Sequence, residues 1–322
     1  MSEFDLINRY FKSHTLQRKD VLLGIGDDCA LLQPPAAKLL AMTADTLVAG
    51  VHFPVNTAAA DIGYKSLAVN LSDLAAMGAE PAWAVLALTL PAADENWLQE
   101  FMRGFSELAN VHGVQLIGGD TTSGPLSITI QLTGFVSPGQ MLRRDAARVG
   151  DKIYVSGTLG DAALGLQYST GRVSSPVALS YCLARLNRPE PRVQLGRELL
   201  AVSQCGIDIS DGLMADLGHI ARASHCGAII HVNKLPLSDE LKTFYATGVD
   251  WSVVAAGGDD YELCFTVPPA HAFVLDVIAK KAQIKLSCIG EMQAGEGVHC
   301  LDENGNEILF GSTGYNHFAD NK

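Results

Sequence analysis

Six short clusters of glycine and aspartate contain the residues whose types and spacing could do chemistry. They lie at residues 24–30, 43–46, 70–73, 118–121, 208–212 and 257–262, and none contains a lysine or an arginine. Carboxylates gathered this densely repel one another, and each resists ionisation beside the next. Mg²⁺ relieves this repulsion because it takes oxygen ligands and shares them with substrate phosphates. The clusters therefore predict a site where several metal ions hold a polyphosphate.

The elements around the clusters explain how these side chains could be positioned. The hydrophobic pattern predicts a strand over residues 38–46, a helix over 61–77, a strand over 114–117 and a helix over 212–224. Most clusters then lie where a strand ends or a helix begins. Carboxylates and backbone N–H groups meet at such ends, which suits cation and phosphate binding respectively.

The rest of the chain continues the alternation of helices and strands. Further helices are predicted at 94–112, 176–186 and 272–282, and further strands at 126–136, 152–156 and 263–267. This order predicts an α/β or α+β fold. A chain of 322 residues is long enough for two domains. The polar segment 140–150 is interpreted as the connection, which predicts domains at 1–139 and 140–322.

Composition excludes several classes of protein. The chain is 48% hydrophobic and 18% charged, with a net charge of −12, and has no run of basic residues. Binding to nucleic acid or to an anionic membrane surface needs a basic face, so neither partner is expected. The seven cysteines include no CxxC pair, which favours reduced thiols over disulfides or zinc. An acidic N-terminus and the absence of a long apolar run predict a cytoplasmic protein.

Familiar phosphate-binding motifs are missing from the sequence. There is no GxxxxGK[ST], no GxGxxG that opens a strand–helix unit, and no HRD or DFG signature of protein kinases. P-loop enzymes, dinucleotide-binding folds and protein kinases are therefore excluded.

Five segments together resemble a known family. Residues 24–30, 70–79, 116–121, 207–213 and 257–263 are similar, in order and spacing, to the thiamine-monophosphate kinases. That family belongs to the superfamily of aminoimidazole ribonucleotide synthetase and selenophosphate synthetase. The similarity runs from about residue 3 to Tyr315.

The resemblance implies an activity and an assembly. The implied reaction converts ATP and thiamine monophosphate to ADP and thiamine diphosphate (EC 2.7.4.16), by direct in-line transfer of the γ-phosphoryl group assisted by several Mg²⁺ ions. A role for K⁺ stays open. The family architecture implies a homodimer in which the N-terminal α/β domains build a shared β-barrel. The C-terminal domain would be an α/β sandwich that completes the nucleotide and substrate cleft.

The resemblance also implies roles for individual residues. Positions similar to the family's metal ligands are Asp28, Thr43, Ala44, Asp45, Asp73, Asp120, Asp208 and Asp211. Nucleotide contacts would come from Gly119, Asp120, Arg144 and Ser210, and thiamine contacts from His52, Asp259 and Tyr315. Asp45, Asp73 and Asp211 are the candidate catalytic residues. The chain departs from the family at Ala44, where Thr or Ser is common, and at Asp259, where Glu is usual.

Simpler roles remain open for single residues. An isolated aspartate is by default a helix cap or a turn residue. Asp216 is interpreted as a solvated or capping residue, and Asp260 and Glu262 as structural.

Two other functions also stay open. One is an enzyme of the same superfamily that acts on a different acceptor. The other is a cation-binding protein without catalytic activity. The clusters lack the D-x-D-x-D spacing of a single calcium loop and lie far apart in the sequence, which favours a substrate site.

Overall fold

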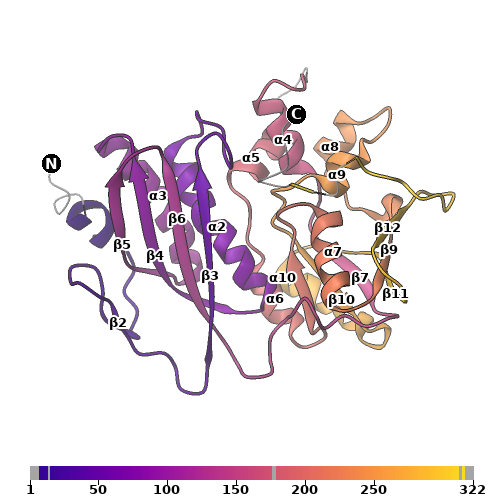
Figure 1. Ribbon diagram of the computed structural model, residues 1–322, viewed down its shortest axis with the longest axis horizontal. Helices are drawn as coiled ribbons and strands as arrows, with labels where there is room; N and C mark the ends of the chain where they lie inside the picture. Colours follow the sequence, from indigo (N-terminus) through magenta and orange to yellow (C-terminus); the bar gives the residue numbers. More distant parts are fainter. Residues whose placement is uncertain (1–6, 14, 176–178, 312–313, 316–322) are drawn as a thin grey trace. The chain divides into compact units, whose positions relative to one another are not determined.

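The computed structural model describes residues 7–13, 15–175, 179–311 and 314–315 (Figure 1). Within them the chain forms two compact units. Unit 1 comprises residues up to 74 together with 79–139, and unit 2 comprises 75–78 and the residues from 140 onward. Each unit is a mixed α/β structure, as the alternating pattern predicts.

Unit 1 is built on a four-stranded sheet in the order β3-β6-β4-β5. β6 pairs antiparallel with β3 and β4, whereas β4 and β5 are parallel and are joined through helix α3. Its elements are the short π-helix η1 (Ile7–Lys12), β1 (Val21–Leu23), β2 (Leu31–Leu32), β3 (Leu39–Val48), α2 (Ala59–Ala76), β4 (Glu80–Leu90), α3 (Glu95–His112), β5 (Gln115–Ser123) and β6 (Ser127–Val136). Within the described residues this sheet is open, with no closure into a barrel.

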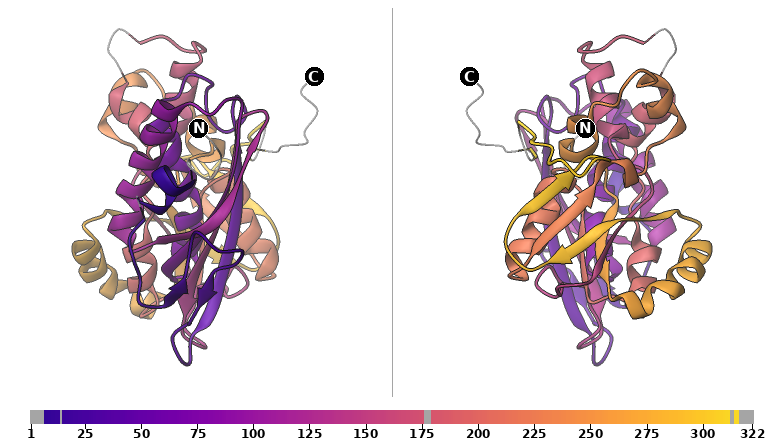
Figure 2. Two further views of the ribbon diagram at one scale, coloured as in Figure 1. Left: turned by 90° about the vertical axis from the view of Figure 1, so that its left-hand side faces the viewer. Right: turned by 90° about the vertical axis from the view of Figure 1, so that its right-hand side faces the viewer.

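Helices α2 and α3 cover one face of this sheet (Figures 1 and 2). The two helices approach closely at Gly63 and Gly104. A Cβ atom would stand 2.0 Å from the Phe101 carbonyl oxygen at Gly63, and 1.8 Å from the Ala60 oxygen at Gly104. Only glycine fits at both positions, because the backbones of the two helices are in contact there. The helices therefore form one thin layer, with α2 held against the sheet.

Unit 2 is built on a six-stranded sheet in the order β12-β9-β11-β7-β10-β8. All its neighbouring strands are antiparallel except β12 and β9. Its strands are β7 (Lys152–Ser156), β8 (Cys205–Asp208), β9 (Gly227–His231), β10 (Leu263–Val267), β11 (Leu286–Gln293) and β12 (Val298–Leu301). Its helices are α4 (Asp161–Ser169), α5 (Ser180–Asn187), α6 (Val193–Leu199), α7 (Leu213–Ala223), η2 (Val232–Lys234), α8 (Asp239–Phe244), α9 (Trp251–Ala256), η3 (Pro269–Val274) and α10 (Leu275–Ala282).

The predicted elements compare well with these bounds. The strands predicted at 152–156 and 263–267 are β7 and β10, and the helix predicted at 212–224 is α7. The helix predicted at 176–186 is found as α5 from Ser180, with 176–178 outside the described residues. No described helix has both the length and the apolar character needed to cross a bilayer.

Candidate functional site

Three predicted metal ligands come together in unit 1. Thr43 and Asp45 lie on β3, and Asp73 lies near the end of α2. The Thr43 hydroxyl donates a hydrogen bond to Asp73 Oδ2. Burial, the charge of Asp73 and a hydrogen bond with it raise the pKa of Asp45 to about 7.

This trio fits a hard cation. Two carboxyl groups that share a proton can exchange it for a divalent ion, which relieves their repulsion. All the side-chain donors are oxygens, the ligand type that Mg²⁺ prefers. Ala44 lies between Thr43 and Asp45 on the strand and has no side-chain donor, so only its carbonyl could serve. Among the described residues, no group of three or more His, Cys, Asp or Glu side chains is arranged to hold a metal ion.

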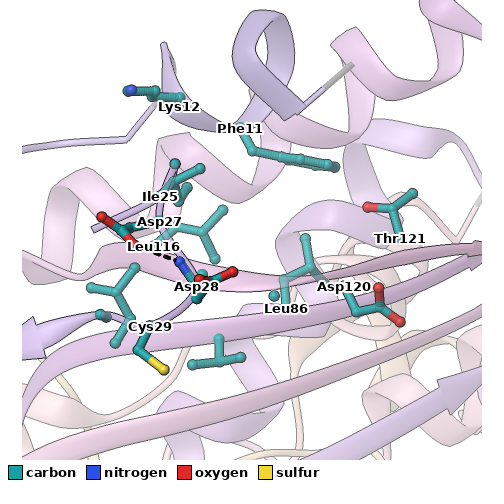
Figure 3. A pocket seen from close by; sticks show the side chains of 16 residues that line it. Phe11, Lys12, Ile25, Asp27, Asp28, Cys29, Leu86, Leu116, Asp120 and Thr121 are labelled. Atoms are coloured by element: carbon teal, nitrogen blue, oxygen red, sulfur yellow. Dashed lines mark hydrogen bonds between the residues drawn. The ribbon is translucent and has the colours of Figure 1, made fainter. Parts of the chain in front are cut away.

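A cavity of about 710 Å³ in unit 1 holds two more predicted ligands (Figure 3). The segment of residues 25–30 lines one side and β5 residues 117–121 line another, so that Asp28 and Asp120 both border the cavity. The Asp28 amide donates a 2.9 Å hydrogen bond to Asp27 Oδ1, which shapes the acidic turn. Both Asp28 and Asp120 are exposed and can reach a ligand in the cavity.

Gly119 forms part of the same wall. Its φ is +155°, and a Cβ atom there would stand 1.8 Å from the Leu86 carbonyl oxygen. The close approach of β5 to β4 therefore needs glycine at this position. This explains structurally why a glycine precedes Asp120.

Two cavity residues were not predicted from the sequence. Phe11 and Lys12 of η1 also line the cavity, so a basic side chain stands at its rim. No spacing rule links residues 11–12 to the acidic turns, because only the folded chain brings η1 over β5.

His52 follows β3 in a turn of unit 1. Its Nδ1 accepts a 3.0 Å hydrogen bond from the Val48 amide, and its carbonyl accepts one of 3.3 Å from Lys65 Nζ. The first bond fixes the orientation of the half-buried ring.

The loop after β8 carries the predicted ligands of unit 2. Asp208 ends β8 and is buried opposite Leu263 of β10, whereas Asp211 is half-buried. Burial, Arg144 and Arg222 lower the pKa of His219, and Asp211 opposes them. The charges of Arg144 and Asp211 therefore both act on the His219 side chain.

Asp216 differs from its predicted solvated state. It is only 3% exposed, and its Oδ2 accepts hydrogen bonds from three backbone amides of the preceding loop. The solvated role is wrong, because the loop folds back over the first turn of α7. The carboxylate binds amides of that loop and of the N-cap residue Gly212 rather than the first amides of the helix itself. Burial and then the charge of Asp211 raise the pKa of Asp216 to about 7, against the effect of the amides.

The predicted thiamine contacts Asp259 and Tyr315 lie against this same loop. Asp259 has a φ of +69°, and its Oδ1 accepts a 3.0 Å hydrogen bond from the Tyr261 hydroxyl. Tyr315 is 51% exposed, and its amide donates a 3.0 Å hydrogen bond to the Asp211 carbonyl. Ser210, Asp211, Asp259 and Tyr315 are thus linked through backbone hydrogen bonds.

A buried ionic network surrounds Glu262, three residues after Asp259 in the sequence. Glu262 is fully buried and accepts hydrogen bonds from Arg185 at 2.8 Å and from Arg192 at 2.5 and 2.7 Å. Ser156 donates to the same carboxylate, and Asp260 accepts the Gly160 amide at 3.0 Å. The structural role predicted for Asp260 and Glu262 agrees with this network, but neither arginine was predicted as their partner.

Both units match models of one protein family. Residues 26–136 match the model described as "AIR synthase related protein, N-terminal domain", and residues 148–302 match the corresponding C-terminal domain. These two domains define the class of the protein. Within that class, the chain belongs to the thiamine-monophosphate kinase family.

The similarity extends over the whole chain. The thiamine-monophosphate kinase of Salmonella typhimurium LT2 is 48% identical over 98% of this chain and 98% of its own length. The crystal structure of the enzyme from Stenotrophomonas maltophilia K279a is 49% identical, covers 96% of this chain and 98% of its own, and has a TM-score of 0.87. A structure described as AaThiL complexed with AMPPCP and TMP is 31% identical, with a TM-score of 0.77 over 98% and 97% of the two chains.

Proposed function

We propose that this protein is an ATP-dependent kinase that converts thiamine monophosphate to thiamine diphosphate by direct in-line transfer of the γ-phosphoryl group. The full-length similarity to thiamine-monophosphate kinases, including a relative in complex with AMPPCP and TMP, carries this proposal. The paired carboxyls of Asp45 and Asp73 support the requirement for Mg²⁺.

The acceptor explains why the site contains acids rather than a general base. A phosphomonoester has a second pKa of about 6, so its oxygen is already largely ionised at neutral pH. The remaining difficulty is to bring a monophosphate against a triphosphate. Catalysis then depends on positioning and on neutralising charge.

The residues of each unit have distinct roles in this proposal. In unit 1, Thr43, Asp45 and Asp73 would hold one Mg²⁺, while Asp28 and Asp120 offer carboxylates at the cavity. In unit 2, Asp208 and Asp211 offer further carboxylates, and Arg144 and Ser210 contact the nucleotide. When bound, Mg²⁺ would neutralise phosphate charge and align the reacting groups.

Substrate recognition would use three further side chains. Asp259 presents a carboxylate to the cationic thiazolium ring, held in place by the Tyr261 hydroxyl. Tyr315 is exposed enough to stack on a ring of the substrate. His52, with its ring fixed by Val48, completes the set.

The assembly proposed here is a homodimer through unit 1. β3 is an edge strand of the open sheet, and its apolar side chains Leu39, Leu40 and Met42 are exposed. An exposed apolar edge strand is a template for pairing with another chain. A second copy would cover it and extend the sheet toward the shared barrel of the family.

The direct test is the reaction itself. The purified protein is incubated with ATP and Mg²⁺, with and without thiamine monophosphate, and the thiamine species are separated by chromatography. Formation of thiamine diphosphate in equal amount to ADP, abolished by EDTA, is the expected result. ATP that stays intact in the presence of thiamine monophosphate would overturn the proposal and favour another acceptor.

The variant Asp45→Asn tests the carboxyl pair. Loss of one ligand should lower kcat/KM by at least about a hundredfold, because the charge of the transferring group is no longer neutralised. Glu100→Gln on the exposed face of α3 is the control and should retain full activity. Unchanged Mg²⁺ dependence in Asp45→Asn would show that this carboxyl does not hold the ion.

A further inference from the structure

The loop between β8 and α7 has an unusual arrangement of its amide groups. The N–H groups of Ser210, Asp211 and Gly212 all point at one atom, Asp216 Oδ2, at 3.0, 3.1 and 3.1 Å. Successive amides that converge in this way form a concavity that typically binds an anion such as phosphate. Here the buried carboxylate of the chain itself fills that concavity.

The carbonyl groups of the same loop are also engaged. Ile209 O accepts the Tyr261 amide at 2.8 Å, and Ser210 O accepts the Asp259 amide at 2.8 Å. Asp211 O accepts the Tyr315 amide at 3.0 Å. The loop therefore holds Asp216 on its N–H side and the two predicted thiamine-contacting residues on its C=O side.

The backbone path of this loop requires glycine at position 212. Its φ is +119°, and a Cβ atom there would stand 2.8 Å from the Ala256 carbonyl carbon. The loop is thus held by α9 on one side and by Asp216 on the other. A backbone in a sparsely populated conformation needs such external hydrogen bonds to persist.

We infer that Asp216 is a positioning residue of the kinase reaction, an inference that rests on the proposed function. It sets the direction in which Ser210 and Asp211 present their side chains. Through the loop carbonyls it also sets the positions of Asp259 and Tyr315. One buried carboxylate thereby couples the metal and nucleotide residues of unit 2 to its thiamine-contacting residues.

The same geometry determines what this loop can bind. Because its three amides are occupied by Asp216, they do not cradle a phosphate. The loop meets its ligands through side chains instead, and its carboxylates attract cations. Phosphate at this loop is therefore recognised indirectly, through the ions that Asp208 and Asp211 attract.

The first test is hydrogen exchange in the intact protein without ligands. In Asp216→Ala, the amides of residues 210–212 should exchange at least about tenfold faster than in the wild type, since each loses its acceptor. Asp216→Asn keeps an acceptor oxygen of the same shape and should restore most of the protection. Asp276→Asn is the matched control, because Asp276 also lies in the first turn of a helix, α10, but is exposed.

The second test separates positioning from stability. Asp216→Ala should raise both the KM for thiamine monophosphate and the Mg²⁺ concentration for half-maximal rate by about tenfold or more. Asp216→Asn should stay within about threefold of the wild type, and Asp276→Asn should not differ from it. A purely structural residue would lower Tm and leave both constants of the folded enzyme unchanged.

The outcomes distinguish the two proposals. Unchanged exchange at 210–212 in Asp216→Ala, or faster exchange with unchanged constants, would overturn the positioning role. If Asp216→Ala does not fold, Asp216→Glu replaces it in both tests, because the longer side chain displaces the acceptor oxygen from the three amides. Wild-type exchange and wild-type constants in Asp216→Glu would then overturn the positioning role as well. A wild-type protein without kinase activity would instead overturn the proposed function, while the exchange data would still report on the loop.

Discussion

Asp45 and Asp260 each carry a carboxyl group in a place where its ionisation is unfavourable. The two groups have different roles. Asp45 is set against Asp73, where a cation can replace the shared proton. Asp260 is only 1% exposed, and both its oxygens lie within 3.1 Å of the Gly160 amide. Gly160 immediately precedes α4, so this hydrogen bond ties the segment that bears Asp259 to the start of α4, and Asp260 acts as an anchor.

The burial of Asp260 predicts a dependence of stability on pH. Burial raises its pKa well above the ordinary value of 3.8. A carboxyl whose pKa rises on folding stabilises the fold fully below the unfolded pKa, and this contribution is lost as the pH rises through the folded pKa. The contribution of Asp260 to the free energy of unfolding should therefore decrease as the pH rises from about 4.

Asp260→Asn should remove that loss. The amide keeps an acceptor for Gly160, so the variant should be more stable than the wild type by about 5 °C in Tm at pH 8, and by less at pH 5. Thermal unfolding across this range measures the difference. Asp239→Asn, at a fully exposed position, should show no such trend. A difference in Tm that is constant with pH would show that ionisation of Asp260 is not responsible.

Residue types and spacing predict much at this scale, because the acidic clusters are local. Thr43, Asp45 and Asp73 lie on one strand and one helix that were both predicted, but their grouping as metal ligands was implied by the resemblance. The partners of Glu262 do not follow in this way, since Arg185 and Arg192 are 77 and 70 residues away in sequence. Burial of an acid next to an arginine is a property of packing, and no period in the sequence reports it.

At the scale of elements, a substitution at Gly119 tests whether β5 must pack closely against β4. Gly119→Ala would place a methyl group against the Leu86 carbonyl and should destabilise the protein by more than about 2 kcal/mol. Gly118→Ala is a matched control, because a Cβ atom at Gly118 would meet nothing within 4 Å. Urea unfolding compares the two variants. Equal stability of both would mean that β5 can move away from β4 freely.

A substitution of Glu262 tests whether its ion pairs with Arg185 and Arg192 stabilise the segment that follows α9. Glu262→Ala would leave Arg185 and Arg192 buried without their carboxylate, which should lower the free energy of unfolding by about 3–5 kcal/mol. Glu291→Ala breaks the partly exposed pair with Lys152 and a 3.3 Å hydrogen bond from Gln293, and should leave the urea midpoint nearly unchanged. If both variants unfold at the wild-type midpoint, the network does not stabilise the fold.

The elements that the sequence predicts well are those with a clear period. α3 repeats its apolar residues at helical spacing and is capped by Asp94, whose carboxylate accepts the Asn96 and Trp97 amides. β6 alternates partly exposed and buried residues from Ser127 to Leu132, and the residues that follow to Val136 are all buried. Helices α8 and α9 were missed, because six residues are too few to establish a helical period.

At the scale of the whole molecule, the open sheet of unit 1 has consequences for assembly. Its strand β3 has β6 as a neighbour on one side, and Met42 near its start is 65% exposed. Large apolar side chains on an edge strand favour association unless charge or a covering element blocks it. The net charge of −12 does not protect this edge, because the segment 39–44 contains no charged residue.

The double variant Leu40→Lys/Met42→Lys should convert the dimer to a monomer, because two charges would be buried at the new interface without partners. Light scattering after size exclusion should give the wild type twice the 34.2 kDa of one chain, and the variant that mass once. Phe273→Lys in unit 2 is the control, since Phe273 is 77% exposed and lies far along the chain from β3, and it should stay dimeric. A wild-type monomer would overturn the proposed assembly. A double variant that remains dimeric would instead move the interface away from β3, and the kinase assay on the same samples would then show whether activity depends on the dimer at all.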